Sequence, residues 1–168
     1  MSDITSDKRG VLVIGYGNTL RRDDGVGARA AELLAADPRL SGDDVEVQER
    51  YQLLPEMALD IGACSLVIFV DADLRGLPGS IEIRPIEADA PRSDADARAE
   101  PGASSHHVGG GELVALAAEL MGHRPEAVQI GIGIADTELG EGLTPAVEAA
   151  LPRVADIVVD LIADHRAR

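Results

Sequence analysis

Two adjacent carboxylates are the first residues of this chain that could carry chemistry. They are Asp23 and Asp24, and they lie in the segment 11–27, which reads VLVIGYGNTLRRDDGVG. Val11–Ile14 has the apolar character of a strand, and a turn with two glycines leads from it towards a predicted helix. A carboxylate at a helix start can cap free N–H groups, but one residue is enough for that role. The second carboxylate therefore predicts a site that attracts a cation.

A further carboxylate, Asp71, directly follows the apolar run Leu66–Val70 (LVIFV), which is typical of a strand buried on both faces. Ligand sites in open α/β sheets form beyond the carboxyl ends of the strands, so Asp71 is a candidate site residue. A carboxylate there is poorly solvated unless it meets a cation or several hydrogen-bond donors. Donors from loop N–H groups alone would also satisfy it, so both interpretations stay open. The side chain of Asp73 either points towards the same site as Asp71 or only stabilises the turn that follows.

Imidazole groups form the third candidate set. Ser104–His107 reads SSHH and precedes another predicted helix. Imidazole is the commonest transition-metal ligand, and two carboxylates plus one imidazole give three protein ligands with open coordination positions, as in catalytic metal sites. Either His106 or His107 could be that ligand. His123 and His165 have no comparable setting, and we assign both to the surface.

The rest of the sequence alternates strand-like and helix-like segments, which predicts the elements that position these residues. The expected strands share short apolar or alternating patterns: 11–14, 45–48, 66–70, 80–85 and 128–134. The expected helices share apolar stripes at helical spacing, or begin at Thr-Pro: 26–34, 53–61, 113–121 and one from 144 to near the C-terminus. This alternation predicts an α/β fold in a single layered domain over residues 10–168.

Composition narrows the function classes. The chain has 168 residues, 15 Lys plus Arg against 30 Asp plus Glu, and a formal net charge of −15, so a nucleic-acid backbone would be repelled. No apolar stretch approaches the length of a membrane span, and the N-terminus lacks the apolar core of a signal peptide. The single cysteine excludes an intrachain disulfide and a Cys-rich zinc site. We therefore expect a soluble cytoplasmic protein that binds neither nucleic acid nor membrane.

Two polar segments are expected to lack regular structure. Residues 1–9 are predicted to form a disordered N-terminal tail. The stretch 86–103 is rich in Ala, Asp, Arg, Pro and Ser, and it contains almost no large apolar residue. It is predicted to be a mobile surface loop.

The segment 15–27 (GYGNTLRRDDGVG) resembles the signature of the nickel–iron hydrogenase maturation endopeptidases. The similarity continues in the same order through VDA at 70–72, SHH at 105–107 and GLTPAV at 142–147. It spans nearly the whole chain, and the combination is far more specific than any one motif. The resemblance implies a single three-layer α/β domain with a twisted, mostly parallel sheet flanked by helices.

The resemblance also implies an activity and a set of site residues. These metal-dependent proteases remove a C-terminal extension from the precursor of the hydrogenase large subunit once nickel has been inserted. Carried over motif by motif, the metal-binding and catalytic residues are Asp24, Asp71 and His106, with nickel presented by the precursor. His106 is preferred to His107 because it opens the His-x-x-Gly stretch that ends at Gly109. Zinc or another divalent metal is expected to be able to occupy such a site in isolation.

Two residues of the first turn receive supporting roles. Asp23 is expected to support the site or to cap the helix, and Asn18 to suit a turn with positive φ rather than to bind substrate backbone. The segment 50–56 (RYQLLPE) departs from relatives that carry glycine-rich sequence there. It resembles instead the members that serve other hydrogenase classes.

Two alternative functions remain to be weighed. A nickel chaperone or sensor of hydrogenase maturation, without proteolytic activity, would use the same three ligands and the same acidic surface. The DxD pattern formed by Asp71 and Asp73 is also found in aspartate-nucleophile phosphatases. Those enzymes need a lysine downstream, whereas Lys8 is the only lysine in this chain. The sequence therefore disfavours the phosphatase.

Overall fold

The computed structural model describes residues 9–87 and 108–168, which form an α/β domain around one five-stranded sheet. The strands, in chain order, are β1 (Arg9–Tyr16), β2 (Val45–Arg50), β3 (Cys64–Asp73), β4 (Ile81–Pro85) and β5 (Glu126–Gly133). Their order across the sheet is β2-β1-β3-β5-β4, in which only the edge pairing of β4 with β5 is antiparallel. The prediction of a mostly parallel sheet, with the alternating segment 80–85 near an edge, is confirmed.

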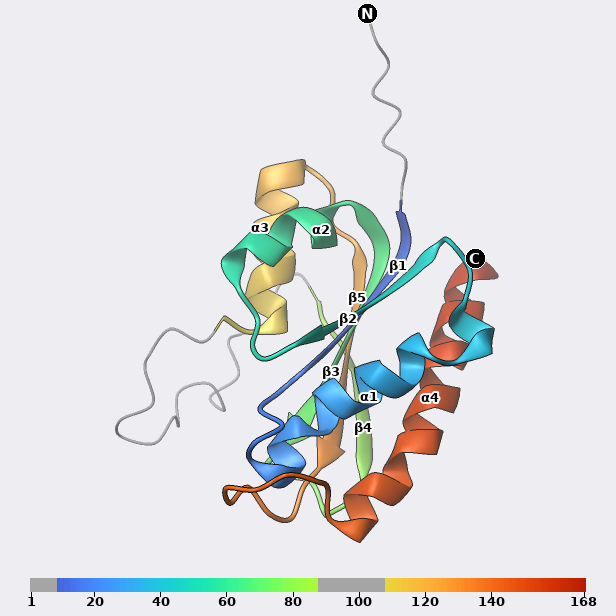
Figure 1. The fold of residues 1–168 in the computed structure, drawn as a ribbon. Coiled ribbons are helices and arrows are strands. Elements are labelled where there is room, and N and C mark those ends of the chain that lie inside the picture. Colours follow the sequence, from blue (N-terminus) through green and yellow to red (C-terminus); the bar gives the residue numbers. More distant parts are fainter. Residues whose placement is uncertain (1–8, 88–107) are drawn as a thin grey trace, which may run out of the picture.

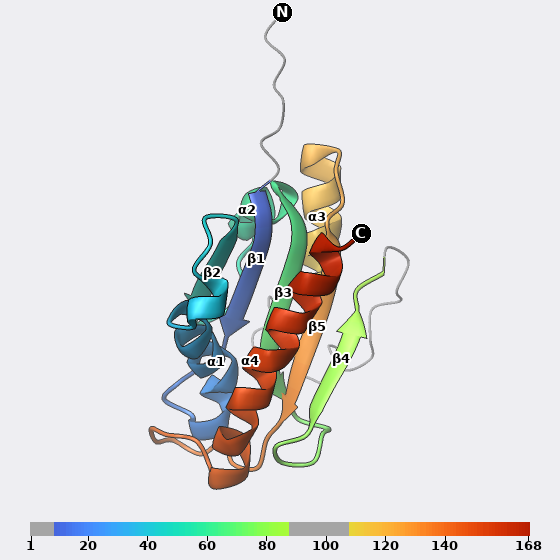
Figure 2. The same ribbon diagram turned by 90° about the vertical axis from the view of Figure 1, so that its right-hand side faces the viewer.

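Four α-helices cover the two faces of the sheet, as Figures 1 and 2 show. They are α1 (Val26–Ala35), α2 (Ala58–Gly62), α3 (Gly110–Met121) and α4 (Pro145–Arg166). Helices α1 and α4 pack on one face, which is turned towards the viewer in Figure 2, and α2 and α3 pack on the other. Three short 3-10 turns, η1 (Arg22–Gly25), η2 (Pro38–Leu40) and η3 (Pro55–Met57), complete the described elements. The three-layer architecture is therefore confirmed.

Alternating side chains build a separate core on each face of the sheet. In β1, Val11 and Val13 pack with α1 and α4, whereas Leu12 and Ile14 pack with α2 and α3. This alternation follows from the two-residue period of a strand. Phe69 of β3 is fully buried in the core on the α2 and α3 side. In a chain so poor in aromatic residues, aliphatic side chains supply nearly all of the remaining buried volume.

The element boundaries correct the sequence-based expectations in one functionally relevant place. The strand predicted to end at Val70 continues to Asp73, so Asp71 lies inside β3 rather than after it. The extension occurs because Asp71 pairs with Gly131 and Asp73 with Gly133 in β5. Ile86, the first residue of the loop predicted at 86–103, still pairs with β5: its N–H donates a hydrogen bond to Ala127 O (2.8 Å). Residues 88–103 lie outside the described part.

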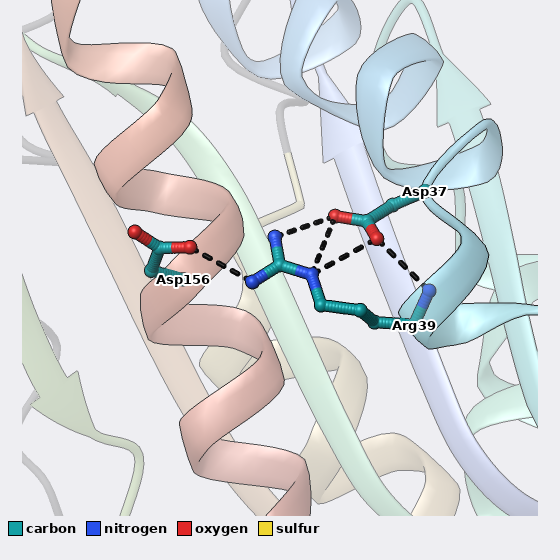
Figure 3. A network of polar contacts seen from close by, with 3 residues as sticks. All are labelled: Asp37, Arg39 and Asp156. Carbon is teal, nitrogen blue, oxygen red and sulfur yellow. Dashed lines mark hydrogen bonds and ion pairs between the residues drawn. The ribbon is translucent and has the colours of Figure 1, made fainter.

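An exposed polar network ties η2 to α4, as Figure 3 shows. The Arg39 guanidinium donates to Asp37 (2.7 Å) and to Asp156 on α4 (2.9 Å). Two carboxylates beside one guanidinium raise the pKa of Arg39, and the Arg39 contacts hold the pKa of Asp37 below its usual range. Because Arg39 and Asp156 are open to solvent, water and salt screen these pairs and they contribute little to stability.

A second network fastens the end of α4 to the amino ends of β3 and β5. His165 Nδ1 lies 2.7 Å from Glu126 Oε2, and its Nε2 lies 3.0 Å from the Ser65 hydroxyl oxygen. Arg168 also pairs with Glu126, at 3.0 Å. The assignment of His165 to the plain surface is therefore wrong. Its ring is half-buried between two strands, because α4 runs the whole length of the sheet.

This second network makes Glu126→Gln a test of the packing of α4. Partial burial raises the pKa of Glu126, but the contacts with His165 and Arg168 outweigh it and lower that pKa below its usual value. The ionised carboxylate therefore stabilises the fold above its ordinary pKa, and the contribution is lost as the pH falls through the lowered value. We expect the variant to lose about 1 kcal/mol near neutral pH, which lowers Tm by roughly 2–4 °C.

The check on Glu126→Gln is thermal unfolding of both proteins between about pH 3 and pH 8. The difference in Tm should shrink as the pH falls through the lowered pKa of Glu126, because the wild-type carboxylate then also becomes neutral. Equal Tm values at neutral pH would mean that the network contributes nothing.

Within residues 9–87 and 108–168, no helix combines the length and apolarity that a bilayer crossing requires.

Candidate functional site

Close packing of backbone against backbone brings η1 to the carboxyl ends of β1 and β3. Gly27, in the first turn of α1, sits so near the carbonyl oxygens of Tyr16 and Val70 that a Cβ would collide with both. Gly17 has φ +151°, and a Cβ there would collide with the carbonyl of Asp24. The glycines of the GYGN…GVG segment therefore let the Asp24 turn lie directly on the ends of these two strands.

Asp24 is half-buried at this edge of the sheet. Its Oδ2 accepts a hydrogen bond from the backbone N–H of Asn18 (3.2 Å). The Asn18 side chain accepts from the N–H of Leu20 (3.0 Å) and donates to the hydroxyl of Tyr51 (2.9 Å). Asn18 is not among the positive-φ residues, so that expectation is wrong. Its side chain instead folds the turn that presents a backbone donor to Asp24.

Asp71 lies on the α2 and α3 face of β3, two residues beyond the buried Phe69. It is partly buried, and its Oδ1 accepts from the N–H of Ala72 (2.7 Å). The Tyr16 side chain also hydrogen-bonds the carboxylate. The partner of Asp71 on β5 is Gly131, so that position brings no side chain over the carboxyl group.

The electrostatics of Asp71 distinguish it from the other carboxylates of the described chain. Burial is the main cause that raises its pKa to about 7, and the negative charges of Asp24 and Asp73 raise it further. The hydrogen bonds from Ala72 and Tyr16 act in the opposite direction without cancelling the effect. Perturbed carboxyl groups of this kind are typical of functional sites. Asp24 and Asp71, predicted from separate segments, are thus close enough for their charges to interact.

Asp23 has a different role from its neighbour. It is 0% exposed, and it accepts four hydrogen bonds from the segment that joins β5 to α4. The donors are the N–H groups of Ala135 (3.0 Å) and Asp136 (3.1 Å), and both the N–H and the hydroxyl of Thr144 (2.7 Å each). Burial alone raises the pKa of Asp23, but these donors outweigh it and hold the pKa below its usual value. Asp23 supports the site by tying its turn to the next loop, and no cap on its own helix is seen.

Backbone hydrogen bonds also connect the turn that carries Asp23 to the loop between β5 and α4. Arg22 adopts φ +46°, and its N–H donates to Gly140 O (2.9 Å), while the N–H of Gly140 donates to Leu20 O (2.9 Å). The turn with the aspartates and the 135–144 loop therefore form one connected unit at the carboxyl edge of the sheet.

His106 and His107 lie outside the described residues. The described chain resumes just before α3. A Cβ on Gly110 would stand about 3.0 Å from the Phe69 ring, so the helix start packs against β3 on the face that carries Asp71.

The described residues hold part of a possible metal site rather than a whole one. Among residues 9–87 and 108–168, no group of three His, Cys, Asp or Glu side chains is placed to hold a metal ion. Asp24 and Asp71 offer two carboxylates whose mutual repulsion a cation would relieve. Carboxylate and imidazole donors together suit a divalent transition metal. The donor chemistry therefore fits a metal that a third ligand, from this chain or from a substrate, completes.

Reasoning from the sequence missed Tyr16 and Thr144. The register of β1 with β3, which sets Gly15 beside Val70, is the signal that could have placed Tyr16 next to Asp71. The sequence marks Thr144 only as the start of a helix, because its hydrogen bond to Asp23, 121 residues away in the chain, leaves no local pattern.

Comparisons with known proteins identify the fold. No protein-family model matches the chain, and no curated protein sequence matches it either. The NiFe hydrogenase maturation protease HycI from Thermococcus kodakarensis KOD1 has a TM-score of 0.68 at 24% identity, over 96% of this chain and 97% of that one. The hydrogenase maturating endopeptidase HybD from E. coli has a TM-score of 0.73 at 25% identity, over 92% of both chains.

A hydrogenase 2 maturation peptidase from a Thaumarchaeota archaeon is 28% identical, with a TM-score of 0.64 over 90% of this chain and 97% of that one. Structural neighbours across most of the chain are thus hydrogenase maturation proteases, at low sequence identity. This agrees with the resemblance that the sequence motifs indicate.

Proposed function

We propose that this protein is a metal-dependent endopeptidase that removes the C-terminal extension of a nickel–iron hydrogenase large-subunit precursor after nickel insertion. The observation that carries the proposal is the convergence of Asp24 and Asp71, from two separate motifs, at one edge of the sheet. It is supported by the fold, which the chain shares with hydrogenase maturation endopeptidases over most of its length. In this proposal the enzyme acts in the cytoplasm, on a protein partner, without nucleic acid or membrane.

Exposed leucines on the loops around the aspartates support a protein substrate. Leu20 is 58% exposed on the turn that leads to Asp24, and Leu139 is 78% exposed beside the loop pairing at Gly140. Leu74 is 80% exposed immediately after β3. Apolar side chains that gather on one surface are typical of contacts with another protein. A protein precursor would offer such contacts to the loops around the aspartates.

Asp24, Asp71 and His106 would hold nickel carried by the precursor, or a zinc ion in its absence. Such a metal polarises a carbonyl or lowers the pKa of a bound water towards about 7. The backbone N–H of Asn18 holds the Asp24 carboxylate, which would orient the metal carried by the precursor. In the metal-free chain burial raises the pKa of Asp71 to about 7, and a cation at the site would favour the ionised carboxylate that acts as its ligand. Asp23 keeps both loops in place without contact with substrate.

Replacing His106 and His107 one at a time tests the proposed set of metal ligands. His106→Ala should leave the fold intact and abolish conversion of the nickel-loaded precursor, because one of the three ligands is lost. His107→Ala is the matched control, and it should process within about twofold of wild type. The readout is the intact mass of the precursor over time, with circular dichroism to show that both variants fold. Survival of activity in His106→Ala, together with its loss in His107→Ala, would move the ligand by one residue.

A further inference from the structure

We propose that Tyr16 is the positioning residue of Asp71: its hydroxyl holds one side of the carboxylate so that the rest faces the metal. The proposal rests on the proposed function for its setting, since it assumes that Asp71 is a metal ligand. Neither the motif resemblance nor the comparisons assign a role to Tyr16.

The sheet register places Tyr16 for this role. Strands β1 and β3 run parallel, and Gly15 pairs with Val70, so the next residue of each strand is Tyr16 and Asp71. Side chains in register on parallel strands project from the same face. Tyr16 accordingly packs on the α2 and α3 side, where its ring is partly buried beside the core of that face.

The contacts of Asp71 leave a defined place for a ligand. The N–H of Ala72 donates to Oδ1 at 2.7 Å, and the Tyr16 side chain hydrogen-bonds the same carboxylate. Two donors from different strands fix the plane of the carboxyl group. Gly131, its partner across β5, adds no side chain to cover it. A hydrogen bond to a ligating carboxylate fixes its direction, and loss of such a partner typically costs about 10–100-fold in metal affinity or activity.

Tyr16→Phe removes only the hydroxyl, and Ser41→Ala is the control. The Ser41 side chain is exposed and its hydroxyl donates to Pro38 O (2.8 Å), so this variant also removes one hydroxyl, at a place that holds no site residue. Cobalt(II) alone is the probe, with affinity measured on the full chain by competition with a coloured chelator. We expect Tyr16→Phe to weaken cobalt binding at least ~10-fold, and Ser41→Ala to change it less than about twofold.

A second variant separates positioning from a general loss of structure. If Tyr16 acts through Asp71, adding Tyr16→Phe to Asp71→Asn should weaken cobalt binding no further, because coupled residues are not additive. An equal additional loss in that background would show that Tyr16 affects the site by another route. With the nickel-loaded precursor, Tyr16→Phe should lower kcat/KM about 10-fold, because the metal arrives on the substrate.

The outcomes separate this inference from the proposed function. Weaker cobalt binding by Tyr16→Phe in a chain that processes no precursor would keep the role of Tyr16 and refute the protease. Unchanged cobalt affinity and unchanged kcat/KM in Tyr16→Phe, in a chain that does process precursor, would refute the role of Tyr16 alone. A wild-type chain that neither binds cobalt nor processes precursor would refute both.

Discussion

Asp71→Asn should abolish precursor processing and at the same time make the metal-free protein more stable. Asparagine keeps the size of the side chain and can still accept hydrogen bonds from Ala72 and Tyr16, so the fold is retained. It offers no negative charge to a metal. We expect processing to fall more than about 100-fold, since even outer-shell changes at metal sites cost about 10–100-fold.

The stability gain follows from the pKa of Asp71. Burial raises that pKa from 3.8 to about 7, so the folded chain binds this proton more tightly than the unfolded chain does. The stability of the metal-free protein therefore decreases as the pH rises from about 4 to 7, and above 7 the fold carries the full cost of a buried charge. Asp71→Asn removes that cost. It should raise Tm by a few degrees near pH 8 and leave it unchanged near pH 4.

Thermal unfolding in the presence of a chelator, at several pH values, checks this pattern. A fall in Tm at pH 8 would show that the Asp71 charge is not a cost to the fold. A stabilised but inactive variant is the expected mark of a functional residue kept at the expense of stability.

Asp23→Ala should produce the largest loss of stability of any single change at this edge of the sheet. It removes the common acceptor of the four hydrogen bonds donated by Ala135, Asp136 and Thr144. A stranded buried donor costs roughly 1–3 kcal/mol, and because these donors are only partly buried, water satisfies some of them; we expect a total loss of about 3–5 kcal/mol. For a domain of this size that lowers Tm by on the order of 10 °C. Below the ordinary pKa of an aspartate the difference should narrow, because the wild-type charge is itself lost as the pH falls through its lowered pKa.

Asp156→Asn is the matched control for Asp23→Ala. It also removes a charged hydrogen-bond acceptor, but on the exposed network of Figure 3, where Arg39 keeps its contacts with Asp37. Its cost should be much smaller than that of Asp23→Ala, because solvent screens this exposed pair. Urea unfolding of the three proteins measures both values directly. Equal costs for the two variants would contradict the claim that Asp23 anchors the 135–144 loop.

Local patterns of the chain were enough to predict most of the fold. The run Leu66–Val70 predicts a buried strand because every residue is apolar, and the helix from Thr144 is marked by Thr-Pro. The alternation of strands and helices then predicts an α/β fold, and the motif resemblance adds the three layers. Strand ends were less predictable: Asp71 remains in β3 because Gly131 and Gly133 on β5 provide partners, and such pairing lies far away in the sequence.

The candidate site was predictable only in part, for the same reason. Asp24 and Asp71 could be identified as carboxylates next to strand ends, but their proximity depends on β1 and β3 being neighbours. Asp23 and Asp24 have different roles because Asp23 accepts hydrogen bonds from a loop more than 100 residues away in the sequence. No local sequence pattern marks Tyr16, because only the register of β1 with β3 places this tyrosine beside Asp71.

The most direct test of the proposed function is a comparison of nickel-loaded and nickel-free precursor, each incubated with the wild-type chain and followed by intact mass. We predict a single mass loss, equal to a C-terminal peptide, with the nickel-loaded precursor only, and none with Asp71→Asn. Tight nickel binding without any mass change in either precursor would contradict the protease and support a chaperone or sensor.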